Sequence, residues 1–169
     1  MLKFLFFIST ILPLVTHAQD ILEIRKQYTE SLQDEGRCRA LYKRLMTQKI
    51  NNNPVLLGYK GAVAMVMAKF TGNPLSKLSY FKEGKEILEN AIKKAPQELE
   101  LHFIRFGIQE NLPAILMYNE NLKEDKLFII SHLNEVERPQ FKQSILSFLL
   151  RSSHVSEEEK SELSKLVSK

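Results

Sequence analysis

Apolar residues recur at intervals of three and four positions along the chain, and they almost never alternate with polar residues. This spacing places apolar side chains on one face of an α-helix, whereas strict alternation predicts a β-strand. The chain has 169 residues and is 44% hydrophobic, which is enough to bury a core and excludes a disordered chain. We therefore predict an all-α fold of seven to eight antiparallel helices, joined by short connections into one domain.

Prolines and capping residues mark where several of these helices begin and end. Asn53-Pro54 predicts the start of a helix that reaches about residue 70, and Pro96 ends another helix. Ser156 and Glu159 have the spacing of a capping box at the start of the last helix. The expected helices cover roughly residues 21–33, 37–49, 54–70, 78–95, 98–110 and 122–136, followed by two that open at Pro139 and Ser156.

Three glycines bear on how the helices are arranged. Gly36 is expected to separate the first two helices, whereas Gly58 and Gly61 fall inside the third. Because a glycine costs a helix roughly 1 kcal/mol relative to alanine, this pair predicts that a neighbouring helix approaches unusually closely.

The residues expected to face the core in the fourth and sixth helices are Leu78, Phe81, Gly84, Leu88, Ala91, Ala95, Leu127, Ile130, Leu133 and Val136.

The N-terminus has the pattern of a secretory signal peptide. Lys3 precedes an apolar run of about twelve residues, and Thr16 and Ala18 are small enough for the pockets of a signal peptidase. A helix that spans a bilayer needs roughly 20 apolar residues, so an uncleaved membrane anchor is the less favoured alternative. We expect cleavage after Ala18, a signal peptide of residues 1–18, and a single exported domain of residues 19–169, periplasmic or secreted.

The charge of the chain is mildly basic. It carries 24 Lys and Arg against 20 Asp and Glu, and loss of Lys3 with the signal peptide would leave 23 − 20 = +3. The basic residues are dispersed among acidic ones, which is typical of a solvated helical surface. Together with export, this argues against a nucleic-acid partner and leaves open a weak peripheral association with an anionic envelope membrane.

The fourth expected helix carries a spacing found in the second helix of tetratricopeptide repeats: Gly84, Leu88, Ala91 and Pro96. Leu57-Gly58 in the preceding helix resembles the Leu-Gly pair of the first helix of such a repeat. Gly61 stands where the repeat has an aromatic residue, and the separation of 26 residues between Gly58 and Gly84 is about twice that of the repeat. The resemblance implies degenerate helical hairpins stacked as a short α-solenoid or bundle, with a concave face that binds partners.

Two further segments, residues 58–61 and 108–113, are similar to a group of small exported helical bacterial proteins of unassigned activity. This resemblance implies export and a helical fold. It identifies no catalytic residue.

The sequence contains no motif for metal binding, covalent catalysis or phosphate binding. His102, His132 and His154 stand alone in their segments, without a His-x3-His or Glu-x-x-His pair. Cys38 lies on the expected inward face of its helix, where it would act as a small buried hydrophobe, and intermolecular disulfide formation is the alternative. We therefore expect no catalytic residue, no metal and no cofactor.

A group of polar side chains around the fifth helix is the candidate binding site. The residues expected to contribute are Tyr59, Lys60, Arg105, Gln109, Asn111 and Tyr118. Arg105 would donate two parallel hydrogen bonds to a carboxylate of the partner. In the alternative interpretation, these side chains satisfy free backbone groups at a tight helix–turn–helix corner.

These observations favour an exported, non-catalytic helical-repeat module that binds a protein or peptide partner in the periplasm or at the envelope. The alternative is a helical domain that binds a small ligand or lipid, with the ten Phe and five Met lining an apolar cavity. An enzyme with dispersed catalytic residues is a third, less favoured hypothesis.

Overall fold

The computed structural model describes residues 14–48, 50 and 52–167. This part of the chain forms helices without a β-strand, so the predicted all-α fold is confirmed. The α-helices are α1 (Leu14–Ser31), α2 (Glu35–Thr47), α3 (Pro54–Phe70), α4 (Pro74–Lys94), α5 (Leu99–Asn111), α6 (Leu122–His132), α7 (Pro139–Arg151) and α8 (Glu157–Val167). Two single-turn 3-10 helices, η1 (Ala114–Leu116) and η2 (Leu133–Glu135), flank α6.

The N-terminal part of the predicted signal peptide, residues 1–13, lies outside the described residues. Helix α1 begins at Leu14 rather than near residue 21, because no proline or glycine interrupts the chain from residue 14 to the end of the helix. The predicted cleavage point after Ala18 falls within α1, and export remains a prediction. Across the described ranges, no helix combines the length and apolar character needed to cross a membrane.

Side-chain caps fix several helix starts. The Asn53 side chain accepts a hydrogen bond from the backbone N–H of Leu56 at 3.1 Å, as predicted for the start of α3. In α8 the capping box forms in both directions, from Glu159 N–H to Ser156 Oγ at 3.2 Å and from Ser156 N–H to Glu159 Oε2 at 2.8 Å. Gly36, by contrast, lies inside the first turn of α2, because Asp34 caps that helix two residues earlier.

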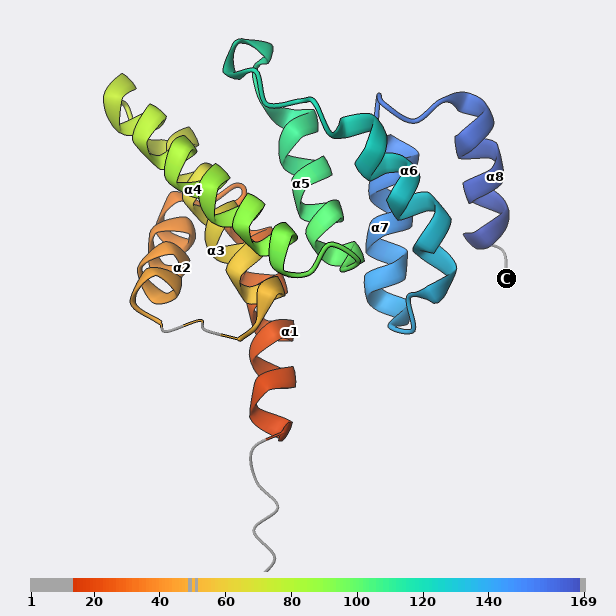
Figure 1. Cartoon of the computed structure of the whole chain (residues 1–169), viewed down its shortest axis with the longest axis horizontal. Helices are drawn as coiled ribbons and strands as arrows, with labels where there is room; N and C mark the ends of the chain where they lie inside the picture. Colours follow the sequence, from red (N-terminus) through yellow and green to blue (C-terminus); the bar gives the residue numbers. More distant parts are fainter. Residues whose placement is uncertain (1–13, 49, 51, 168–169) are drawn as a thin grey trace, which may run out of the picture.

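Successive helices pack as the pairs α1/α2, α3/α4, α5/α6 and α7/α8. The first helix of a pair also contacts the first helix of the next: α1 touches α3, and α3 touches α5. Helix α7 continues this row, since Phe148 packs against Phe103 and Phe106 of α5. Figure 1 shows α4 crossing in front of α3, and α6 in front of α7. We call the row of α1, α3, α5 and α7 the inner layer.

The α3/α4 pair is unusually close, as the glycine spacing predicts. A Cβ atom added at Gly61 would lie 2.6 Å from the carbonyl oxygen of Gly84 and 2.7 Å from the backbone nitrogen of Leu88. One added at Gly84 would lie 2.5 Å from the carbonyl oxygen of Gly61. Gly58 faces α5 instead, where an added Cβ would meet the Leu101 side chain at 2.3 Å. Glycine is therefore required by contacts with two different helices.

Two expected core positions are exposed. Leu78 in α4 is 42% exposed and Leu127 in α6 is 51% exposed, so both predictions are wrong. Helix α6 instead buries Asp125 and Ile129, four residues apart, and its core-facing side continues to Leu133 in η2. The sequence pattern does not predict this rotation of α6 about its axis. Aspartate is usually exposed, so its burial can be inferred only when its binding partners are known.

Helix α5 lies between two hydrophobic clusters and contributes to both. Leu101, Ile104 and Ile108 belong to the cluster formed mainly with α1–α4, whereas Phe106 belongs to the cluster formed with α6–α8. Cys38 is fully buried in the first cluster, as predicted, and burial raises the pKa of its thiol to about 11. Helix α5 therefore joins the two halves of the domain and also carries the buried charges described next.

Candidate binding groove

The helices of the inner layer line an open groove with a volume of about 1050 Å³. Side chains from α1, α3, α5 and α7 all line it, so the groove needs all four helices of the layer. Its volume reaches the upper end of the roughly 300–1,000 Å³ of small-molecule pockets. A groove of this size has room for an extended peptide segment or an elongated ligand.

Aromatic side chains form much of the groove wall. Phe103 lies between Phe141 and Phe148, with ring centroids 6.0 and 5.4 Å away in edge-to-face geometry. On the opposite side, the Tyr28 and Tyr59 rings meet edge to face at 5.2 Å. Amide and hydroxyl side chains also line the groove: Thr29, Gln33, Asn111, Gln140, Gln143, Ser144 and Ser147. The groove therefore offers apolar surface together with many hydrogen-bonding groups.

A cluster around the buried side chain of Glu100, at the start of α5, lies behind one end of the groove. This carboxylate is only 1% exposed, and it accepts hydrogen bonds from Arg25 Nε at 2.6 Å and Arg25 Nη2 at 2.7 Å. The Tyr59 hydroxyl donates to it at 2.8 Å, and Arg138 Nη2 approaches at 3.3 Å. We call these four residues the Glu100 cluster. It connects α1, α3, α5 and the start of α7.

The electrostatics of the Glu100 cluster follow from burial and from the carboxylate. Burial, followed by the charge of Glu100 and the hydrogen bond to it, raises the pKa of Tyr59 well above its usual range. Burial lowers the pKa of Arg25, but the bond to Glu100 and its charge outweigh this and raise it. Tyr59 therefore stays a neutral donor and Arg25 stays charged at physiological pH. Within the described residues, the Nη1 atom of Arg25 is buried without a hydrogen-bond partner.

The lining of the groove is basic. The charged side chains that reach it, within the described part of the chain, are Arg25, Lys26, Lys69, Arg138 and Arg151, with no aspartate or glutamate among them. Glu100 does not itself line the groove, but its carboxylate neutralises one of these positive charges. Lys69 and Arg151 lie in the last turns of α3 and α7, and Lys69 Nζ donates to the carbonyl oxygen of Leu32 at 2.7 Å. The end of the groove away from the Glu100 cluster is therefore positively charged.

A second buried cluster lies outside the groove, between α4, α5 and α6. Arg105 donates from Nε and Nη2 to the two oxygens of Asp125, each at 2.7 Å, and from Nη1 to Glu89 at 3.0 Å. The Tyr118 hydroxyl donates to the other oxygen of Glu89 at 2.5 Å. His102 completes the set, which we call the Asp125 cluster, because its Nδ1 lies 2.7 Å from Asp125 Oδ1.

Ion pairing controls the protonation of the Asp125 cluster. Burial lowers the pKa of His102, but the hydrogen bonds to Asp125 and to the carbonyl oxygen of Pro96 outweigh it and raise the pKa. Both ring nitrogens face acceptors, at 2.7 and 2.9 Å, and only the protonated ring donates to both. The same balance raises the pKa of Arg105, and burial together with Glu89 raises that of Tyr118.

The structure divides the six predicted site residues among several places. Tyr59 and Asn111 line the groove, and the Asn111 side chain donates to the carbonyl oxygen of Gly107 at 2.8 Å. Arg105 and Tyr118 belong to the buried Asp125 cluster, where Arg105 is 5% exposed.

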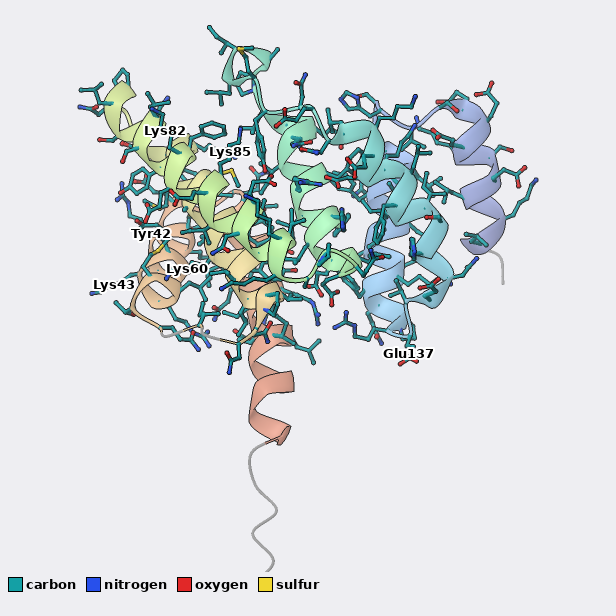
Figure 2. The ribbon with its side chains drawn as sticks, viewed as in Figure 1. Tyr42, Lys43, Lys60, Lys82, Lys85 and Glu137 are labelled. Atoms are coloured by element: carbon teal, nitrogen blue, oxygen red, sulfur yellow. The ribbon has the colours of Figure 1, made fainter. Side chains whose placement is uncertain are left out.

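The remaining two predicted residues lie apart from the groove lining. Gln109 is buried, and its Nε2 lies 3.5 Å from Asn121 Oδ1. The Lys60 side chain, on α3, makes no hydrogen bond or ion pair within the described residues and is labelled in Figure 2. The six residues therefore do not form one surface, because one face of α5 lines the groove and the other contacts α4 and α6. Arg105 and Tyr118 bond the carboxylates of Asp125 and Glu89 rather than the free backbone groups that the corner interpretation expects.

Most of the residues that line the groove are not predicted from the sequence. The walls contributed by α1 and α7 come from segments more than a hundred residues apart, and no motif connects them. One available signal was the charge of Glu100 in the segment 99–104, whose other residues are apolar except for His102. A charge within such a segment predicts a buried partner, although it does not identify that partner as Arg25.

No group of three or more metal-ligating side chains occurs within the described ranges. No protein-family model, curated protein sequence or solved structure matches the chain significantly. The groove is therefore the feature of this chain that bears most directly on its function.

Proposed function

We propose that the chain is a non-catalytic helical interaction module whose inner-layer groove binds a peptide segment of a protein partner. The observation that carries this proposal is the open groove of about 1050 Å³, with aromatic walls and a polar lining. Aromatic rings supply contact area at low conformational-entropy cost, and amides and hydroxyls suit the N–H and C=O groups of a peptide backbone. The tetratricopeptide resemblance and the predicted export supply the remaining parts of the proposal, a helical-repeat fold and a periplasmic or envelope location.

The distribution of ionisable groups supports binding over catalysis. His102, Asp125 and Glu89 bind one another or Arg105 in a cluster outside the groove lining. Glu100 accepts hydrogen bonds from Arg25 and Tyr59 behind the groove wall. A general acid or base needs a titratable group within reach of a substrate. In this chain the buried carboxylates hold helices together.

The alternative function, binding of a lipid or small apolar ligand, predicts a dry enclosed cavity. The groove is open, and amide, hydroxyl and cationic side chains reach it from all four helices. Such a lining favours a peptide over an acyl chain, because buried polar groups left without partners are costly. We therefore keep lipid binding as an outcome of the test.

The test is selection of short random peptides on the folded protein, followed by fluorescence anisotropy with the selected peptides. Ser144→Trp places a large side chain in the groove from an exposed position, without removing a core contact. Ser161→Trp makes the same change at an exposed position on α8, outside the groove lining. We expect convergent peptides whose affinity falls about tenfold or more in Ser144→Trp and stays unchanged in Ser161→Trp.

Either of two results would overturn the proposal. One is the absence of any convergent peptide; a fatty acid that then raises the melting temperature of the wild type would favour the lipid-binding alternative. The other is an equal affinity of both tryptophan variants for the selected peptides, which would place the binding surface elsewhere.

A further inference from the structure

We infer that the groove selects acidic peptides, with apolar side chains against its aromatic walls and carboxylates at its cationic end. This inference rests on the proposed function and adds the chemical class of the partner. It is carried by the charge of the lining: five basic side chains and no acidic one among the described residues that reach the groove.

The five charges are not equivalent. Arg25 and Arg138 both bind Glu100, at 2.6 and 3.3 Å, so part of their charge is already neutralised. Lys26, Lys69 and Arg151 are exposed, and none has a carboxylate partner within the described part of the chain. Lys69 uses one N–H for the carbonyl oxygen of Leu32 and lies 5.3 Å from the centroid of the Phe70 ring, so its charge is not neutralised by a carboxylate.

Two of the free charges lie at one end of the apolar surface. Lys69 is in the last turn of α3, Arg151 ends α7, and Asn111 ends α5, which lies between those helices in the inner layer. Phe103 and Phe148 lie along the groove between the cationic end and the Glu100 cluster at the other end. A peptide along the groove thus meets aromatic rings in the middle and cations at one end. This arrangement matches a segment that carries an acidic residue at one end of a run of apolar ones.

A basic peptide fits this lining poorly. Its cations would meet Lys69, Lys26 and Arg151 without a carboxylate to offset them, and like charges brought together oppose binding. A flat anionic membrane would not reach the aromatic walls of a recessed groove, which favours a peptide over a lipid surface.

The test compares the peptides selected by three forms of the protein from one random library. The groove variant is Lys69→Glu with Arg151→Glu. The matched control is Lys43→Glu with Lys82→Glu, which makes the same change in net charge on α2 and α4, where Figure 2 labels both lysines. A milder variant, Lys69→Gln with Arg151→Gln, covers the case in which charge reversal unfolds the protein, and circular dichroism checks each fold.

We expect the wild type and the control to enrich Asp and Glu, and the groove variant to lose this enrichment. The affinity of a selected acidic peptide should fall roughly tenfold in the groove variant and should weaken as salt is added. Convergent peptides without acidic enrichment would overturn this inference and leave the proposed function standing. Equal loss in the groove variant and the control would also overturn it, because general attraction to a basic protein would then explain the selection. If no peptide converges, the proposed function itself fails.

Discussion

Arg105 binds both oxygens of Asp125 in a bidentate ion pair, with Nε–Oδ2 and Nη2–Oδ1 distances of 2.7 Å. Asp125 is fully buried and Arg105 is 5% exposed, so the pair joins α5 to α6 away from water. His102 binds the same carboxylate from the preceding turn of α5. Removal of Asp125 therefore leaves two cationic groups without their main partner.

We predict that Asp125→Ala lowers the free energy of unfolding by about 3–5 kcal/mol, because breaking a buried pair leaves an uncompensated charge. Urea denaturation followed by circular dichroism measures this loss. Glu124→Ala is the matched control, since Glu124 is the exposed neighbour on the same helix turn. The two variants should differ by several kcal/mol, and equal stabilities would contradict the structural role of the ion pair.

A second prediction concerns the contact between α3 and α4. Gly84→Ala should destabilise the protein by about 1–3 kcal/mol, even though alanine favours helices by roughly 1 kcal/mol, because the added Cβ meets backbone atoms of α3. Gly107→Ala in α5 is the control, since its Cβ would lie 3.6 Å from Phe148, an ordinary contact. Thermal unfolding should show a lower midpoint for Gly84→Ala and an unchanged or higher one for Gly107→Ala. A higher midpoint for both would mean that α3 and α4 are farther apart than described.

The glycines illustrate how much of the fold follows from sequence. Helix α3 has the predicted bounds because Asn53 and Pro54 specify its start locally, and the close approach at Gly61 follows from the cost of glycine in a helix. Local rules of this kind do not specify how a helix is rotated about its axis. Leu127 was therefore expected in the core, although Asp125 occupies that side.

The candidate site was less predictable. Arg105 and Tyr59 were both identified as important polar residues, but they lie in separate clusters on opposite sides of α5. The groove depends on α7 returning to the inner layer beside α5, as shown by Phe103 against Phe148. This contact between α5 and α7 is tertiary, and the sequence of neither helix predicts it.

The Glu100 cluster gives a third prediction. Tyr59→Phe removes a buried donor to Glu100 and should cost about 1.5–3 kcal/mol, the range for hydrogen bonds to charged groups. Tyr42→Phe is the matched control, because its hydroxyl donates to Glu83 at 3.1 Å near the surface and should cost less than about 1 kcal/mol. Urea denaturation of both variants gives the comparison. A larger loss for Tyr42→Phe would contradict the assignment of Glu100 as a buried anchor.

A fourth prediction follows from the raised pKa of His102. A histidine whose pKa is higher in the folded than in the unfolded state stabilises the protein fully below the unfolded value, about 6.5, and loses this contribution as pH rises through the folded value. The stability difference between wild type and His102→Gln should therefore be larger at pH 6 than at pH 9. Urea denaturation at the two pH values measures it, with His154→Gln, at an exposed position, as control. A difference that grows with pH would have the wrong sign for this account.

The central claim is that a peptide binds in the inner-layer groove, and amide chemical-shift mapping with a selected peptide tests it most directly. We predict shifts at Thr29, Gly107 and Ser144, which line the groove on three different helices, and little change at Asn121 and Lys82 outside it. Shifts confined to the residues around Arg105, Gln109 and Asn121, with the groove amides unchanged, would contradict the account and assign binding to the opposite face of α5.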